Sequence, residues 1–207
     1  MIRTVVGIEG PVLAGKTTVI GALCSLLKHR GVDCTAVPCF VQAALDLGMT
    51  LPPAVPKNPD EELEAVRFFV SVDQRRRPLF APGVIFLDRT LWTLLAHNMA
   101  LARTHRLDAV AKVQDYLRRT NLTELMPNHL IYLDVSHTQQ LARARERAAL
   151  PEPFLDPEFN MEFRAFFQRM ASEHNAHWVN ADEQAPVVAD RIDCLLSQFL
   201  GRDHDQK

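Results

Sequence analysis

An intact phosphate-binding motif, Gly-x4-Gly-Lys-Thr, runs from Gly10 to Thr17, directly after the apolar run 4–8. Phosphates concentrate negative charge, so a loop that binds them needs backbone N–H groups turned inward, which the left-handed turns of Gly10 and Gly15 permit. Lys16 is expected to reach the β- and γ-phosphate oxygens of ATP, and the Thr17 hydroxyl to bind Mg²⁺. A helical pattern follows the loop, so the positive end of its dipole would face the phosphates. The alternative is a glycine turn that binds nothing.

An acidic and a basic residue, Asp88 and Arg89, end a second apolar run that begins at Gly83. Ligands of parallel α/β sheets bind at the carboxyl ends of strands, so Asp88 is expected near the phosphate loop. There it could hold Mg²⁺ through water or take a proton from an attacking hydroxyl, and Arg89 could bind an acceptor phosphate in bidentate fashion. The alternative is a strand-end ion pair or a helix cap.

Three arginines, Arg143, Arg145 and Arg147, lie on a helix that is predicted to begin after Ser136. Arg143 and Arg147 are one turn apart and share a face. They precede a proline-containing segment, 149–153, as the arginines of a lid do when they reach over a transferring phosphoryl group. For either arginine alone, a solvated basic face is an equally good interpretation.

Another run of arginines, Arg75, Arg76 and Arg77, ends a helix that is predicted to begin at Asn58. A capping asparagine, a proline in the first turn and three acidic residues favour this start. Successive helical positions point in different directions, so only one or two of these arginines could face a cleft. Two interpretations stay open, a solvated helix end and a contact between one arginine and an anionic acceptor.

The elements that position these residues follow an alternating pattern. Apolar, β-branched runs alternate with longer helical patterns, which is typical of a parallel sheet between helices in an α/β fold. Strands are predicted at 3–8, 33–38, 83–88, 129–135 and 176–180. Helical patterns run over 18–30, 91–103 and 107–119, and further helices begin near Asn58, Ser136 and Asp156 and after Asp182. Residues 40–48 lead into a proline-rich loop at 51–59.

Length and composition limit the classes of protein. The chain has 207 residues, 47% of them hydrophobic, and we expect a single domain over 1–200 with a flexible tail at 201–207. With 23 basic and 25 acidic residues it has no general attraction for polyanions, so long nucleic acid is not an expected partner. The four cysteines form no Cys-x-x-Cys pair, and we find neither a signal peptide nor a membrane-spanning run. We expect reduced thiols in a cytoplasmic protein that does not bind membranes.

Taken in order, these motifs resemble the thymidylate kinase and deoxynucleoside kinase superfamily of P-loop phosphotransferases over nearly the whole chain. Residues 8–18 resemble the opening of thymidylate kinases, Asp88-Arg89 matches their Asp-Arg motif, and Phe68-Phe69 is similar to their acceptor-binding helix. The family's fourth strand corresponds to the strand end at 133–135. Its lid arm corresponds to the arginine helix, and its adenine-side loop corresponds to the 180–182 turn. The resemblance implies a three-layer P-loop kinase fold with a five-stranded parallel sheet of order 2-3-1-4-5, helices on both faces and a short lid. It also implies a possible homodimer.

The resemblance implies roles for single residues as well. ATP would contact the loop and the adenine-side turn through Gly10, Ala14, Gly15, Lys16, Thr17, Thr18 and Asp182. Thr17 and Asp88 would bind Mg²⁺, Arg89 the acceptor, and Arg143 or Arg147 the charge that develops during transfer.

The chain departs from thymidylate kinases at several positions. Their phosphate loop contains an acid or an arginine, whereas this loop has Val12-Leu13, more like deoxynucleoside kinases. The acidic or Glu-Pro motif after their second strand is replaced by Val37-Pro38-Cys39, and the expected lid, 150–157, has no arginine of its own. The resemblance therefore fixes the acceptor less well than the fold and the reaction type.

One departure concerns the base of the acceptor. Phe69 fits the aromatic residue that stacks on the base in thymidylate kinases, but Asp73 stands one turn on, where those enzymes have an arginine that reads a thymine carbonyl. An ionised carboxylate cannot donate a hydrogen bond to a carbonyl. We therefore expect dTMP to be a poor acceptor and a base with an exocyclic amine, such as cytosine or adenine, to be preferred. Alternatively, a one-residue shift brings Arg75 to this place and Asp73 pairs with Arg77.

The expected function is that of an ATP- and Mg²⁺-dependent phosphotransferase, which moves the γ-phosphoryl group to a nucleotide or nucleoside-like small molecule. One alternative is a P-loop kinase of a non-nucleotide metabolite or of an antibiotic hydroxyl. Another is a non-catalytic NTP-binding regulatory module or a GTPase switch. The chain lacks the Asn-Lys-x-Asp and Asp-x-x-Gly motifs of guanine-nucleotide switches, which argues against the GTPase.

Overall fold

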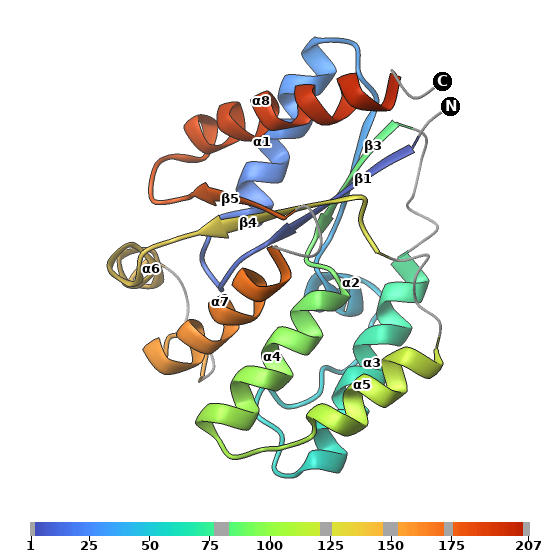
Figure 1. Ribbon diagram of the computed structural model, residues 1–207, viewed down its shortest axis with the longest axis vertical. Coiled ribbons are helices and arrows are strands. Elements are labelled where there is room, and N and C mark those ends of the chain that lie inside the picture. Colours follow the sequence, from blue (N-terminus) through green and yellow to red (C-terminus); the bar gives the residue numbers. More distant parts are fainter. Residues whose placement is uncertain (1–2, 77–82, 121–125, 147–152, 172–175, 205–207) are drawn as a thin grey trace.

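A computed structural model describes residues 3–76, 83–120, 126–146, 153–171 and 176–204, and of residues 199–204 the backbone alone. Five parallel strands form one sheet in the order β2-β3-β1-β4-β5, which confirms the predicted topology (Figure 1). The strands are β1 (Arg3–Glu9), β2 (Cys34–Val37), β3 (Gly83–Asp88), β4 (His129–Asp134) and β5 (Ala176–Asn180), each within one residue of its predicted ends.

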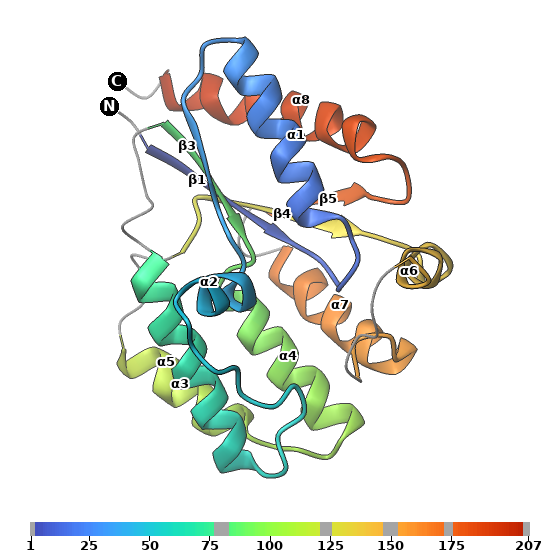
Figure 2. The same ribbon diagram turned by 180° about the vertical axis from the view of Figure 1, so that it is seen from behind.

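Helices cover both faces of the sheet and give the fold three layers. They are α1 (Lys16–His29), α2 (Phe40–Asp46), α3 (Pro59–Arg76), α4 (Leu91–Thr104), α5 (Val110–Arg119), α6 (His137–Ala144), α7 (Pro157–Ala171) and α8 (Ala185–His204). Helices α1 and α8 lie on one face, and α4 and α7 lie on the other with α3 and α5 beside them (Figures 1 and 2). Within the described residues, no helix is both long enough and apolar enough to cross a membrane.

Each face of the sheet has its own apolar core. Leu23 of α1 and Ile192 of α8 pack with Phe86 of β3 on one side. Phe167 of α7 packs with Tyr132 of β4 on the other side. Strands that are buried on both faces need apolar residues at nearly every position, which is why their sequences read as continuous apolar runs.

Side-chain caps fix the start of several helices. The Asn58 side-chain oxygen accepts hydrogen bonds from the backbone N–H groups of Asp60 and Glu61, at 3.1 and 2.9 Å, at the start of α3. The Ser136 hydroxyl accepts one from Gln139 N at 3.3 Å at the start of α6. Both caps confirm the predicted helix starts, because each side chain satisfies N–H groups that have no partner within the helix.

Three boundaries differ from the sequence prediction. Residues 40–48, to which the sequence analysis assigned no element, contain α2, which buries Phe40 and Ala43 against α3. Helix α5 begins at Val110 and not at Leu107. Helix α8 runs to His204, into the expected tail, and residues 205–207 lie outside the described part of the chain.

The strand register sets the position of the site. Ile8 of β1 is level with Asp88 of β3 and with Ile131 of β4. The carboxyl ends of these three central strands therefore meet at one edge of the sheet. The phosphate loop leaves β1 at this edge and Asp88 ends β3 there, so the topology brings the two predicted motifs together.

Candidate active site

The loop between β1 and α1 has the backbone form that its glycines predict. Gly10 has a φ of 138° and Gly15 a φ of 88°, both of which are strained for other residues. At Gly10 there is also no room, because a Cβ atom would lie 2.6 Å from the carbonyl oxygen of Leu133. Leu13 has a φ of 66° as well, so a residue with a side chain holds a left-handed turn in this loop.

Lys16 lies buried at the start of α1, with its amine on the loop itself. Its Nζ atom donates hydrogen bonds to the carbonyl oxygens of Gly10 at 3.0 Å and Pro11 at 2.7 Å. Burial, together with the nearby positive charge of Arg89, lowers the pKa of Lys16 to about 7, against the opposing effect of the Asp88 carboxylate. Phosphate oxygens would be stronger partners for this amine than two neutral carbonyls, since they carry charge.

Asp88 and Thr17 meet at the mouth of the loop. The Thr17 hydroxyl donates to Asp88 Oδ2 at 2.5 Å. The other oxygen, Asp88 Oδ1, is buried and has no hydrogen-bond partner among the described residues. An orphaned carboxylate oxygen is costly unless a ligand satisfies it.

This pair fits a magnesium ion that is held mainly by phosphates and water. Mg²⁺ takes oxygen ligands and is usually bound by one or two protein side chains and not by a full protein cage. Asp88 and Thr17 supply such oxygens. Consistent with that chemistry, no group of three or more His, Cys, Asp or Glu side chains gathers as a metal site in the described ranges.

A cavity of about 720 Å³ connects these groups. Its wall includes the phosphate loop from Val12 to Thr18, Asp88 and Arg89 from the end of β3, and Arg143 from α6. The 181–185 segment after β5 closes the far side. The structure thus places the ATP and metal candidates around one space, except Gly10, which does not line the cavity.

Arg143 contacts the phosphate loop directly. Its guanidinium donates to the carbonyl oxygens of Leu13 at 3.0 Å and Ala181 at 2.7 Å. It therefore joins the loop to the turn after β5, on the wall of the cavity. Arg147, the other predicted lid arginine, lies outside the described residues.

Comparisons with known proteins agree with this geometry. No protein-family model matches the chain. It is 26% identical over 206 residues to a thymidylate kinase of Geobacillus thermodenitrificans strain NG80-2, covering 93% of this chain and 89% of that protein. It is 27% identical over 213 residues to a thymidylate kinase of Francisella philomiragia, covering 93% and 97%.

The fold has solved neighbours of the same general kind. A deoxyadenosine kinase from M. mycoides with bound dCTP matches with a TM-score of 0.68 at 18% identity, over 94% of this chain and all of that one. The same enzyme with bound dATP matches with a TM-score of 0.65 at 19% identity. The sequence likeness to thymidylate kinases and the fold likeness to deoxyadenosine kinases support a relationship to P-loop nucleoside and nucleotide kinases.

The resemblance predicted that the turn after β5 faces adenine. Ser136, which caps α6, contacts this turn. Asp182 Oδ1 accepts a hydrogen bond from Ser136 N at 2.7 Å, and Asp182 N donates to Asn180 Oδ1 at 2.9 Å. Asp182 also lines the cavity. Its carboxylate thus shapes the turn, and its predicted contact with ATP stays a prediction.

Gln140 contacts the phosphate loop, and the sequence did not reveal this contact. It is buried, and its amide nitrogen donates to Val12 O in the phosphate loop at 2.9 Å and to Phe154 O at 3.2 Å. It lies one turn before Arg143, so the same face of α6 holds the carbonyls of Val12 and Leu13.

The predicted acceptor residues lie on α3. The ring of Phe69 packs against Phe40 at 6.0 Å and Phe68 at 5.2 Å between centroids. Asp73 is buried. Its Oδ1 atom accepts a hydrogen bond from Arg76 Nε at 2.7 Å and forms an ion pair with Arg76 Nη2 at 2.5 Å. Among the described residues, neither Phe69 nor Asp73 lines the cavity.

The ion pair of Asp73 differs from the one that the sequence left open. The sequence left open a pair with Arg77, which lies outside the described residues, and the structure pairs Asp73 with Arg76. A base amine would have to share the carboxylate with a buried guanidinium. The base preference therefore stays a prediction.

A second missed residue, Glu9, holds the other side of the Asp88-Arg89 turn. It is fully buried at the end of β1. Its Oε1 atom accepts from Thr90 N and Thr90 Oγ1, both at 2.7 Å, and its Oε2 atom accepts from Thr93 Oγ1 at 2.5 Å. Burial raises the pKa of Glu9, and the positive charge of Arg89 counteracts this. The sequence placed Glu9 only within a motif and gave it no role.

Proposed function

We propose that this protein transfers the γ-phosphoryl group of ATP, in a Mg²⁺-dependent reaction, to a nucleoside or a nucleotide. One observation carries the proposal: Asp88 Oδ1 is buried without a protein partner beside the Thr17 hydroxyl, at the mouth of the phosphate loop. The thymidylate kinases and deoxyadenosine kinases that it resembles support a nucleoside or nucleotide as the acceptor.

The residues divide the work of binding. The backbone N–H groups of the loop and the Lys16 amine would bind the phosphates, with Lys16 leaving the carbonyls of Gly10 and Pro11. Thr17 and Asp88 would hold Mg²⁺, which when bound neutralises charge on the β- and γ-phosphates. Arg89, which lines the same cavity, would bind the acceptor.

The reaction itself demands little covalent chemistry from the protein. An acceptor oxygen attacks the γ-phosphorus, the bond from that phosphorus to the β–γ bridging oxygen breaks, and ADP leaves. A hydroxyl acceptor must also lose its proton, and Asp88 is the candidate base at this edge. Catalysis then depends on alignment and on charge that is already in place, which Arg89 and Arg143 supply in this proposal.

A phosphoryl-transfer screen tests the function. ATP consumption is measured with nucleosides, mononucleotides and hydroxylated metabolites, each with Mg²⁺ and with EDTA. We expect Mg²⁺-dependent consumption with at least one nucleoside or nucleotide. Consumption with only a non-nucleotide metabolite would replace the acceptor class, and ATP binding without turnover on any acceptor would indicate a binding module.

A further inference from the structure

Arg76 is buried, although it lies in a run of three arginines at the end of a helix. Its side chain is 1% exposed, whereas that of its neighbour Arg75 lies on the surface. The two interpretations of the arginine run were a solvated helix end and a contact with an anionic acceptor. Neither fits the buried position of Arg76. An arginine guanidinium has five N–H donors, so its role can be found by following each of them.

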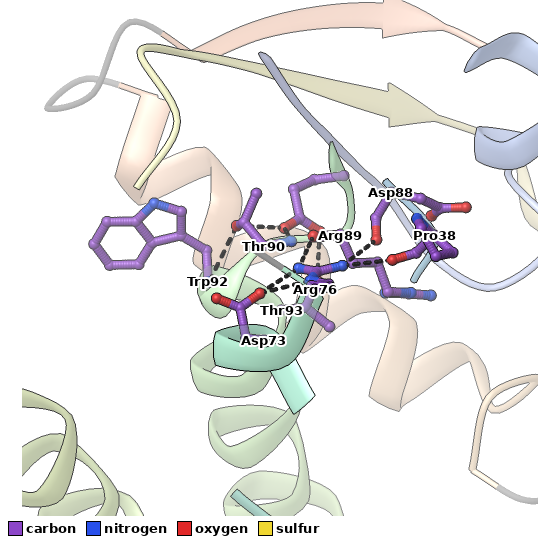
Figure 3. A network of polar contacts seen from close by, with 9 residues as sticks. Pro38, Asp73, Arg76, Asp88, Arg89, Thr90, Trp92 and Thr93 are labelled. Carbon is purple, nitrogen blue, oxygen red and sulfur yellow. Dashed lines mark hydrogen bonds and ion pairs between the residues drawn. The ribbon is translucent and has the colours of Figure 1, made fainter. Parts of the chain in front are cut away.

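Every nitrogen of the guanidinium has partners within the protein. Nε donates a hydrogen bond to Asp73 Oδ1 at 2.7 Å, and Nη2 forms an ion pair with the same oxygen. Nη1 donates to Pro38 O at 2.7 Å and to Asp88 O at 3.4 Å, and Nη2 donates to Arg89 O at 2.9 Å. Figure 3 shows the guanidinium between Asp73 and the strand ends. The protein thus engages all three nitrogens of this side chain.

The acceptors of these bonds lie in the turn that carries the predicted chemistry. Pro38 follows β2, and Asp88 and Arg89 end β3. The guanidinium also lies over the ring of Phe40, 4.2 Å from its centroid, which adds a cation–π contact. One side chain from α3 thus joins the ends of two strands and the start of α2.

The turn needs such support because Arg89 has a φ of 70°. A left-handed conformation is unfavourable for a residue with a Cβ atom, and it persists only where the surroundings fix it. The backbone groups are held one after another: Arg89 N donates to Ile8 O at 3.1 Å, Arg89 O accepts from Arg76, and Thr90 N donates to Glu9. Glu9 and Arg76, which are both buried, thus bind neighbouring backbone groups of this turn.

We propose that Arg76, with Asp73 as its counter-ion, is a positioning residue for phosphoryl transfer. It fixes the backbone of Asp88 and Arg89 so that the Asp88 carboxylate meets Thr17 and the Arg89 side chain lines the cavity. This inference rests on the proposed function. It assigns Arg76 no contact with substrate, in contrast to the open sequence interpretation in which an arginine of this run binds the acceptor.

The central test is Arg76→Lys, with Arg67→Lys as the matched control at an exposed arginine of the same helix. Lysine keeps the charge but offers three donors from one point, so it cannot hold Asp73 and three carbonyls together. We expect kcat to fall about 10- to 100-fold with every acceptor, as misplacement of reacting groups does. The KM for each acceptor and the Kd for ATP in EDTA should stay at wild-type values, because the phosphate loop is unchanged. Arg67→Lys should match the wild type throughout.

A second variant covers the case in which Arg76→Lys fails to fold. The double variant Asp73→Leu with Arg76→Leu removes both charges, so no lone charge is left buried, and such replacements often preserve stability. It still lacks every donor to Asp88 O and Arg89 O. We expect a folded protein with the same loss of kcat.

The outcomes separate this inference from the proposed function. A folded variant with wild-type kcat overturns the positioning role. A rise in KM for one acceptor with kcat unchanged assigns Arg76 to direct acceptor binding and also overturns it. If the wild type transfers phosphate to no acceptor, the proposed function fails, and amide hydrogen exchange then tests whether Arg76 holds the turn. Faster exchange at Arg89 and Thr90 in Arg76→Lys supports the positioning role. Unchanged exchange overturns it.

Discussion

The proposed ATP side and the proposed acceptor side of this site use their charged residues in opposite ways. Around the phosphate loop, Lys16 contacts two neutral carbonyls, and Asp88 keeps a buried oxygen without a partner among the described residues. On α3, Arg76 and Asp73 form an ion pair, and all three nitrogens of the Arg76 guanidinium contact protein groups. Charged groups with unused hydrogen-bonding capacity are the ones that a ligand can bind. Charged groups whose bonds go to the protein hold the other residues in place.

Loss of the Lys16 amine should have the largest effect on activity. Lys16→Ala is expected to lower phosphoryl transfer by at least ~10²-fold, as the loss of a preorganised charge contact does. The fold should survive, because the hydrogen bonds that the amine makes to described residues go to two neutral loop carbonyls. Steady-state kinetics and thermal unfolding measure both. Near-normal turnover by the folded variant would remove the phosphate loop from the reaction.

Asp88→Asn should separate chemistry from binding on the same side of the comparison. The amide keeps the shape of the carboxylate but loses the charge that would act on metal or proton in the transition state. We expect kcat to fall by ~10-fold or more while the Kd for ATP in EDTA changes little, since only transition-state contacts are lost. Equal losses in transfer and in ATP binding would make Asp88 a structural acid.

Asp73→Asn sharpens the acceptor side, where two readings of one residue make different predictions. If Asp73 reads an exocyclic amine, wild type prefers cytosine or adenine acceptors to dTMP, and the variant narrows a gap of about 1–3 kcal/mol in specificity. If Asp73 serves only Arg76, the variant lowers kcat for all acceptors alike. The ratios of kcat/KM for dCMP and dTMP decide. A wild type that favours dTMP would dispose of the base preference.

The smallest predicted effect is a proton taken up when ATP binds. Lys16 has a lowered pKa of about 7 without ligand, mainly because it is buried. Phosphate charge favours the protonated amine and raises this pKa, so ATP binding takes up protons above pH 7 and its affinity falls as pH rises. Calorimetry at pH 8 in buffers of different ionisation enthalpy measures the uptake. Lys16→Arg, which stays charged, should show none, and equal uptake in both proteins would refute the assignment.

Much of the fold could be predicted because its signals are local. The five strands read as apolar β-branched runs, and the caps at Asn58 and Ser136 act over a few residues. Helix α2 escaped prediction because it spans only seven residues, and its burial depends on α3, far along the chain. The strand order came from the resemblance and was confirmed.

The site also contains residues whose positions could be predicted and residues whose positions could not. A contiguous motif predicts the place of Lys16 and Thr17, and the rule for strand ends brings Asp88 to them. The direction of Arg76 could not be predicted, since three adjacent arginines look alike until the packing of α3 is known. Gln140 gave no signal either, because a glutamine on a short helix reads as surface until its partner carbonyls are in place.

Product analysis of a complete reaction tests the central claim most directly. Wild type and Lys16→Ala are incubated with ATP, Mg²⁺ and a deoxynucleoside or deoxynucleoside monophosphate, and the products are identified by ³¹P NMR and mass spectrometry. The account predicts a phosphorylated acceptor and ADP in equal amounts with the wild type, no product in EDTA, and little with Lys16→Ala. ATP that binds but yields no phosphorylated acceptor, or a Lys16→Ala variant that forms product at the wild-type rate, would contradict it.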